Sequence, residues 1–164
     1  MLHTIVGKRG RGKTSLAAEI VAEKSYDAYW IYDYCGEFSQ FAVDESVRVE
    51  SNSGSFEQFM VDMWDDAGKN ESTLVLLDEI AVYGKNNPQI DHLYRLGRHR
   101  RIDIIAISQR FYSLPVITRS QTDIYHVFQI TESRDVQYLA GVVSRAVLQK
   151  IITLGMFEYI NLTL

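Results

Sequence analysis

The chain has 164 residues, which is enough for one well-buried domain and too few for two of ordinary size. Its 46% hydrophobic and 23% charged residues are ordinary for a folded domain and do not indicate disorder. No apolar run of 18 residues and no charged-then-apolar leader occurs in the sequence, so neither a membrane span nor a secretory signal is expected. The net charge of −4 argues against nucleic acid as a partner. The charge is unevenly distributed, however, because residues 1–82 hold 7 Lys and Arg against 15 Asp and Glu, whereas residues 83–164 hold 10 Lys and Arg against 6 Asp and Glu. The second half could therefore form a basic surface, or the division of solvated charges could be due to chance.

The first half of the chain alternates short apolar segments with segments of helical spacing. Apolar residues on one helical face of 55–67, with Ser55 as a cap, predict an amphipathic helix. The nearly continuous apolar run "TLVLLDE" predicts a strand that is covered by helices on both faces. We expect strands at 2–6, 28–33, 47–50 and 73–79, and helices at 13–25 and 55–67.

The second half continues the same alternation. Ser133 and Ser144 each precede a helical pattern and are predicted as helix caps. The expected elements are strands at 102–108 and 123–130, helices near 89–97, at 133–143 and at 144–154, and an edge strand within 156–164. This alternation predicts an α/β fold with a mostly parallel sheet, and no linker divides the chain, so residues 1–164 are expected to form a single domain.

The segment "GKRGRGKTS" follows the first predicted strand and opens the first predicted helix. It matches G-x-x-x-x-G-K-[ST], the phosphate-binding loop of nucleotide-binding proteins, in the strand-then-helix context that the motif requires. Lys13 is expected to reach the β- and γ-phosphates of ATP and the Thr14 hydroxyl to bind Mg²⁺. The predicted nucleotide contacts are Gly7, Lys8, Arg9, Gly10, Arg11, Gly12, Lys13, Thr14 and Ser15. A plain glycine-rich turn is the alternative, and the three further cations Lys8, Arg9 and Arg11 could equally face solvent, nucleic acid or a neighbouring subunit.

Two more predicted strands end in polar residues that suit hydrolysis of a bound triphosphate. Asp78 ends one of them, where a carboxylate could hold Mg²⁺ or merely cap the next turn. Glu79 follows and suits the deprotonation of an attacking water, and Gln109 stands at the end of "IDIIAIS", where it could sense the γ-phosphate or lie in an ordinary surface loop. A guanine-reading [NT]-K-x-D segment is absent from the sequence, which disfavours a GTPase.

In combination, these segments resemble the FtsK/HerA-type P-loop ATPases, and among them the genome-packaging ATPases of membrane-containing double-stranded DNA viruses. The resemblance extends over residues 2 to about 130. It is carried by "GKRGRGKTS", "IYDYCGEF", "LVLLDE", "GRHRRIDIIAISQR" and "LPVITRS".

The resemblance implies a three-layer, RecA/ASCE-like P-loop fold with a mostly parallel central sheet flanked by helices. In it the phosphate-loop strand lies between the Gln109 strand and the 123–130 strand, with the Asp78 strand beyond that of Gln109. It also implies a homo-oligomeric, hexameric ring in which an arginine of one subunit completes the next subunit's site. Within "RLGRHRR" the first candidate is Arg98, followed by Arg101 and Arg95, although this basic run could instead touch DNA phosphates or solvent. His92 and His99 lack partners at metal-ligand spacing and are expected at a surface or interface.

The implied function is an ATP-hydrolysing translocase of double-stranded DNA that packages a viral genome. Contact with DNA is expected from core loops, either 83–90 with Lys85 or 110–121 with Arg110 and Arg119, and capsid or viral membrane proteins are further expected partners. The single Cys35 allows no internal disulfide, which fits a reducing compartment. The expected locations are the host cytoplasm and a packaging vertex of the virion.

Three alternatives stay open at this stage. An assembly or secretion ATPase of filamentous-phage type belongs to the same superfamily, but its relatives usually carry a membrane span. A small P-loop kinase needs an arginine-rich lid, for which 95–101 is a candidate, but Glu79 and Gln109 suit water activation better. A nucleotide-bound scaffold or switch without turnover is the third.

Overall fold

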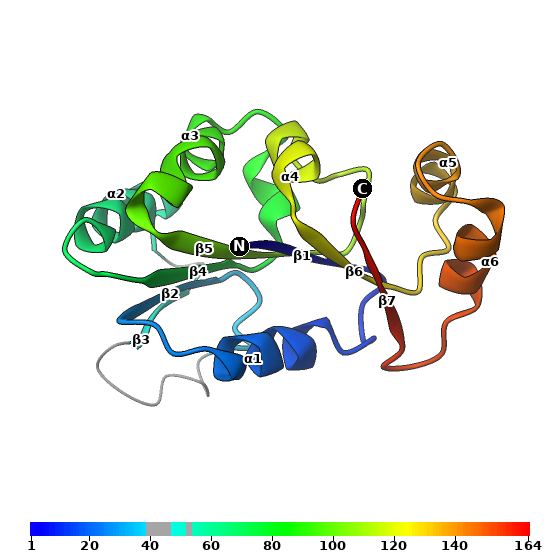
Figure 1. The fold of residues 1–164 in the computed structure, drawn as a ribbon, viewed down its shortest axis with the longest axis horizontal. Coiled ribbons are helices and arrows are strands. Elements are labelled where there is room, and N and C mark those ends of the chain that lie inside the picture. The colour runs from blue at the N-terminus through cyan, green and yellow to red at the C-terminus, as the bar shows by residue number, and fades with distance from the viewer. Residues whose placement is uncertain (39–46, 52–53) are drawn as a thin grey trace.

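In the computed structural model, which describes residues 1–38, 47–51 and 54–164, seven strands form one sheet (Figure 1). Their order across the sheet is β3-β2-β4-β5-β1-β6-β7. The strands are β1 (Leu2–Val6), β2 (Ala28–Asp33), β3 (Val47–Ser51), β4 (Thr73–Leu77), β5 (Ile102–Ser108), β6 (Ile124–Phe128) and β7 (Tyr159–Leu162).

All neighbouring strands pair in parallel except the last pair, in which β7 runs antiparallel to β6. The strand β1 lies between β5 and β6, and β4 lies on the far side of β5, as predicted. Since the six parallel strands share one direction, the residues after their carboxyl ends meet at a single edge of the sheet. This edge receives the segments that follow β1, β2, β4 and β5, which carry the predicted site residues.

Helices cover both faces of the sheet (Figure 1). The helix α1 lies on one face, α2, α3 and α4 lie on the other, and α5 and α6 stand beside the β6–β7 end. Their bounds are α1 Lys13–Glu23, α2 Phe56–Ala67, α3 Pro88–Leu96, α4 Val116–Gln121, α5 Ser133–Ala140 and α6 Arg145–Thr153, and two short 3₁₀ turns cover Ile80–Tyr83 and Gly97–Arg100. The arrangement is the predicted three-layer α/β fold.

The alternation of side chains along β4 explains the layers. Leu74 and Leu76 belong to the apolar cluster that contains Leu16 of α1, whereas Val75 and Leu77 belong to the cluster on the opposite face. Because successive side chains of a strand point to opposite faces, a strand buried on both sides has to be apolar at every position. All five residues of β4 are buried, which confirms the prediction made from its continuous apolar run.

Several predicted boundaries are wrong by a few residues. The strand predicted at 73–79 ends at Leu77, because Glu79 has a φ of 49° and starts a 3₁₀ turn. The strand predicted at 123–130 covers only Ile124–Phe128. The segment 110–121, predicted as a loop, contains the six-residue helix α4, whose β-branched residues are weak helix formers and hid the signal.

Two of the three predicted caps are confirmed. The hydroxyls of Ser55 and Ser144 accept hydrogen bonds from the backbone N–H groups of Gln58 and Val147. The prediction for Ser133 is wrong, because the Glu132 carboxylate caps α5 by accepting from the N–H groups of the next turn. The helix α5 ends at Ala140 rather than at 143. Within the described parts of the chain, no helix has the length and apolar character that crossing a membrane requires.

Candidate functional site

The loop between β1 and α1 is tied to two neighbouring strands. The Gly7 N–H donates to the Ser108 carbonyl at the end of β5 (3.2 Å), and the Lys8 N–H donates to the Gln129 carbonyl after β6 (3.1 Å). Gly7, Gly10 and Gly12 have φ angles of 149°, 72° and 98°, in a region that side-chain-bearing residues rarely occupy. The spacing of these glycines therefore reflects the path that the backbone takes into α1.

A cavity of about 550 Å³ lies over this loop at the carboxyl edge of the sheet. Its wall brings together residues that are far apart in the sequence, from the phosphate-binding loop to the segment before β7. The lining residues are Arg9, Gly10, Gly12, Lys13, Thr14, Ser15, Tyr34, Cys35, Glu37, Asp78, Glu79, Ile107, Gln109 and Phe157.

Lys13 is the buried cation of the cavity, with only 9% of its surface exposed. Its Nζ donates to the Lys8 carbonyl at 3.2 Å, so the side chain reaches back across the loop. Burial lowers the pKa of Lys13, and the nearby carboxylates of Glu79, Asp78 and Glu37 oppose this shift. A polyphosphate in the cavity would add the negative charge that favours the ammonium form.

Asp78 and Glu79 approach the cavity directly after β4. Asp78 is 5% exposed, and its Oδ2 accepts a hydrogen bond from the Cys35 N–H at 3.0 Å. Burial raises the pKa of Asp78, which is the behaviour of a buried carboxylate without a full counter-charge. The Glu79 Oε1 accepts from the Gln109 N–H at 3.3 Å, so Glu79 and Gln109 lie together beside Lys13, at the edge where the sequence predicted them.

The loop after β2 contributes a site residue that sequence reasoning missed. The buried Asp33 carboxylate accepts from the N–H groups of Glu37 (2.9 Å) and Phe38 (2.8 Å). This fixes the loop so that the Thr14 hydroxyl donates to the Glu37 Oε2 at 2.6 Å. The segment "IYDYCGEF" supported the family resemblance, but nothing in its spacing showed that Glu37 reaches Thr14.

The oxygens of Thr14, Asp78 and Glu37 fit a magnesium site that is shared with a nucleotide. Hydroxyl and carboxylate oxygens are the protein ligands that Mg²⁺ prefers, and in nucleotide sites it usually takes one or two of them with phosphate oxygens and waters. No cluster of three or more His, Cys, Asp and Glu side chains suited to hold a metal by itself occurs in residues 1–38, 47–51 and 54–164. A cation here would therefore depend on the phosphates for the rest of its ligands.

Some residues that the sequence assigned to the nucleotide do not line the cavity. Gly7, the first residue of the loop, is buried and does not reach the cavity. Lys8 lines a neighbouring hollow together with Arg9 and Gln109. Arg11 is half-buried and lines neither space. Only six of the nine loop residues that the sequence assigned to the nucleotide therefore line the cavity.

The predicted arginines lie at the opposite end of the sheet. Arg95, Arg98 and Arg101 line a hollow next to Ile102, where β5 begins, whereas Gln109 follows the last residue of β5. Seven residues of strand span roughly 20 Å. The basic run cannot complete the site of its own subunit, and any role in catalysis requires a second subunit.

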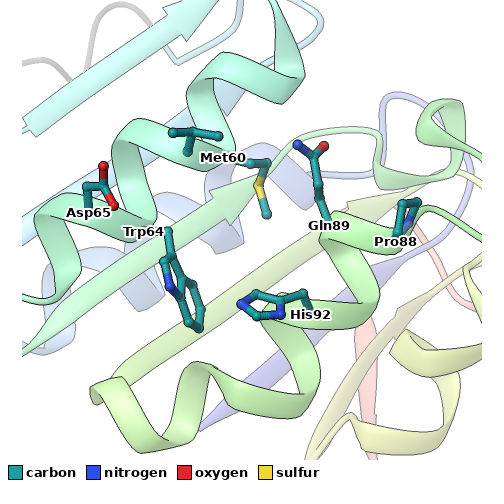
Figure 2. Close-up of a pocket in the computed structure, with 7 residues that line it drawn as sticks. Met60, Trp64, Asp65, Pro88, Gln89 and His92 are labelled. Carbon is teal, nitrogen blue, oxygen red and sulfur yellow. The ribbon is translucent and has the colours of Figure 1, made fainter.

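Another hollow lies between α2 and α3 and is mostly apolar (Figure 2). It measures about 290 Å³ and is lined by Met60, Val61, Trp64, Asp65, Pro88, Gln89 and His92. Since this wall includes no Lys or Arg and one carboxylate, it does not suit a polyphosphate. His92 packs against the Trp64 ring with centroids 4.5 Å apart and is exposed, in agreement with its predicted surface position.

Sequence comparisons relate the chain to known proteins. The family model described as poxvirus A32 protein matches residues 16–159, a range that begins just after the phosphate-binding loop. A DNA packaging ATPase, P9 of Enterobacteria phage PRD1, is 27% identical over 158 residues, which cover 85% of this chain and 68% of P9.

Solved structures share the fold. The genome packaging NTPase B204 of Sulfolobus turreted icosahedral virus 2, in complex with AMPPCP, is 23% identical, with a TM-score of 0.81 over 99% of this chain and 91% of B204. ATPases 2 and 3 of EssC from Geobacillus thermodenitrificans are 16% identical, with a TM-score of 0.67 over 86% of this chain and 34% of EssC.

Proposed function

We propose, because this chain belongs to the poxvirus A32 protein family, that it is the motor subunit of viral genome packaging. In this proposal, ATP hydrolysis in the cavity at the carboxyl edge of the sheet drives duplex DNA through a ring. A packaging ATPase of the FtsK/HerA type is the function that its relatives support. The observation that carries the hydrolytic role is that Lys13, Asp78 and Glu79 meet in one cavity. In this proposal residues 1–164 act as one ATPase domain.

Each residue of the cavity has a distinct part in the proposed reaction. Lys13 and the backbone N–H groups of the loop bind the β- and γ-phosphates and neutralise charge that develops during phosphoryl transfer. Thr14 and Asp78 would hold Mg²⁺, which on binding would neutralise further charge on the phosphates. Glu79 takes a proton from the attacking water, and Gln109, whose N–H holds the Glu79 carboxylate, lies where it can contact that water or the γ-phosphate.

The position of the basic run supports a ring. Arg98 lies at the far end of β5 from its own cavity, so it could reach a nucleotide only in the cavity of a neighbouring subunit, as a head-to-tail ring would allow. A guanidinium supplied in this way would stabilise the transition state of the neighbour's reaction. We therefore propose a hexamer in which Arg98, with Arg101 as second and Arg95 as third candidate, acts across the interface.

Two loops that were predicted to touch DNA meet at an exposed aromatic ring. The Lys85 Nζ lies 3.9 Å from the centroid of the Tyr112 ring, and the Arg134 guanidinium lies 5.9 Å from it. All three side chains are exposed. Two cations around one aromatic ring form a surface suited to the phosphate backbone of DNA, and such contacts need no particular base sequence. This supports DNA as the partner, and the places of action that we propose are the host cytoplasm and a packaging vertex.

The test is the release of phosphate from ATP with and without duplex DNA. We expect DNA to stimulate the reaction several-fold, with the stimulation weakening as salt rises. The double substitution Lys85→Ala and Arg134→Ala should reduce the stimulation without lowering the rate in the absence of DNA, and Lys69→Ala, an exposed lysine after α2, is the matched control.

Two results would contradict this function. A failure of every nucleic acid to stimulate the enzyme at low salt would favour a secretion ATPase or a scaffold. A phosphorylated acceptor in place of inorganic phosphate, seen by phosphorus NMR, would favour a kinase.

A further inference from the structure

One wall of the cavity is formed by an aromatic residue that is remote in sequence from every motif discussed above. Phe157 lies in the turn before β7, yet its ring lies directly over Gly12 at the start of α1. A Cβ atom added to Gly12 would lie 2.7 Å from the Phe157 Cδ1 and 3.4 Å from the Cε1. The absence of a side chain at Gly12 therefore allows this ring to pack against the phosphate-binding loop.

The backbone conformation and the exposure of Phe157 are both energetically unfavourable. Its φ is 63°, in the left-handed region that is unfavourable for an aromatic residue. Its side chain is also exposed, at 66% of its surface, although burial would favour a phenyl ring. The turn is held by a hydrogen bond from the Gly155 N–H to the Glu158 Oε2 at 2.7 Å. A residue that is both strained and exposed at a cavity wall is a candidate for ligand contact.

The distribution of charge in the cavity shows which part of a nucleotide would lie at this wall. The carboxylates of Asp78, Glu79 and Glu37 gather on the side of β4 and β2, where they suit Mg²⁺ and the γ-phosphate end. Phe157 lies over Gly12 from the other side of β1, in the turn before β7, which β5, β1 and β6 separate from β4 in the sheet. A triphosphate bound along the loop with its γ end among the carboxylates directs its nucleoside towards the opposite side.

We infer that the exposed ring of Phe157 stacks on the base of the bound nucleotide, an inference that rests on the nucleotide site proposed above. Tyr34, the other aromatic side chain of the cavity, lies next to Cys35, which binds Asp78, and so belongs to the carboxylate side. Stacking uses the π-face that every base possesses. Phe157 therefore increases affinity for nucleotides over inorganic polyphosphates without distinguishing adenine from guanine.

The experiment compares ADP, GDP and inorganic tripolyphosphate as ligands in the presence of Mg²⁺, by titration calorimetry. For Phe157→Ala we expect the affinity for ADP and GDP to fall about tenfold, and the affinity for tripolyphosphate to stay within about twofold of the unsubstituted chain. Phe157→Trp should restore ADP binding. Met156→Ala, which shortens the equally exposed neighbour at 63%, is the matched control and should bind all three ligands normally.

The indole of Phe157→Trp gives a second, independent measurement, because its fluorescence should change with ADP and stay constant with tripolyphosphate. Equal weakening of all three ligands by Phe157→Ala would assign the ring to the shape of the loop and overturn the inference, as would unchanged binding of ADP. A chain that binds neither ADP nor tripolyphosphate before any substitution would contradict the nucleotide site itself. The two failures are thus distinguishable.

Discussion

Gly7 and Gly10 offer a matched pair of substitutions in the phosphate-binding loop. A Cβ at Gly7 would lie 2.6 Å from the Phe128 Cβ, whereas a Cβ at Gly10 would meet no atom within 4 Å. Both residues have a positive φ. Gly10→Ala therefore adds backbone strain alone, and Gly7→Ala adds strain and a collision.

The collision cannot be relieved by a rotamer change, because the Phe128 Cβ is fixed to the backbone of β6. Ordinary contact begins at 3.4 Å, so the loop has to move by about 0.8 Å, which would weaken the bonds from Gly7 to Ser108 or from Lys8 to Gln129. Strain of about 1–3 kcal/mol and overpacking of about 1–3 kcal/mol together suggest a loss of about 4 kcal/mol. For Gly10→Ala the strain alone is about 1–2 kcal/mol.

In a chain of this size, 1 kcal/mol corresponds to roughly 2–4 °C in melting temperature. We expect Gly7→Ala to lower the melting temperature by roughly 8–16 °C and Gly10→Ala by roughly 2–8 °C, as followed by far-ultraviolet circular dichroism. Melting of the Gly7 variant within about 2 °C of the unsubstituted chain, or above the Gly10 variant, would refute the reasoning from the Phe128 contact.

Three further substitutions test the carboxylates and a half-buried histidine. Glu79→Gln keeps an oxygen that can accept from the Gln109 N–H, so ATP should still bind while turnover falls about 10²- to 10⁴-fold; loss of binding together with turnover would show a role in the fold. Asp33→Asn removes the charge and turns an NH₂ group, which cannot accept, towards one of the two N–H groups that Asp33 binds; it should cost about 1–3 kcal/mol in urea unfolding, and an unchanged midpoint would contradict that anchoring role. Burial lowers the pKa of His3 to about 4 from 6.5, so the unfolded chain takes up the proton first and stability should fall as pH drops from 6.5 to 4; His3→Gln should flatten this fall, and an equally steep fall in the variant would exclude His3 as its cause.

The main cavity was accessible from the sequence because it follows from one rule, whereas the strand order came from the family resemblance. Parallel strands bring their carboxyl ends to one edge, so residues that directly follow β1, β4 and β5 had to meet. Asp78 and Gln109 directly follow apolar strands, and Lys13 belongs to the loop motif after β1, so their positions needed no knowledge of side-chain packing. The roles assigned to these residues stay predictions.

The contacts that sequence reasoning missed depend on loops. Glu37 reaches Thr14 only because the buried Asp33 fixes the turn between them, and no periodicity encodes such a turn. Glu79 looks like the last residue of an apolar strand, but its left-handed φ ends the strand at Leu77. Phe157 lies far along the chain from Gly12, and only the return of β7 to the edge of the sheet brings them together.

The most direct test of the nucleotide site is an experimental structure of the chain with Mg²⁺ and a non-hydrolysable ATP analogue. We predict the triphosphate over the loop before α1, with the Lys13 Nζ within hydrogen-bonding distance of β- and γ-phosphate oxygens and Thr14 and Asp78 at the cation. The Glu79 carboxylate should face the γ-phosphate. A nucleotide bound elsewhere, or one whose γ-phosphate points away from Asp78 and Glu79, would contradict the proposed site.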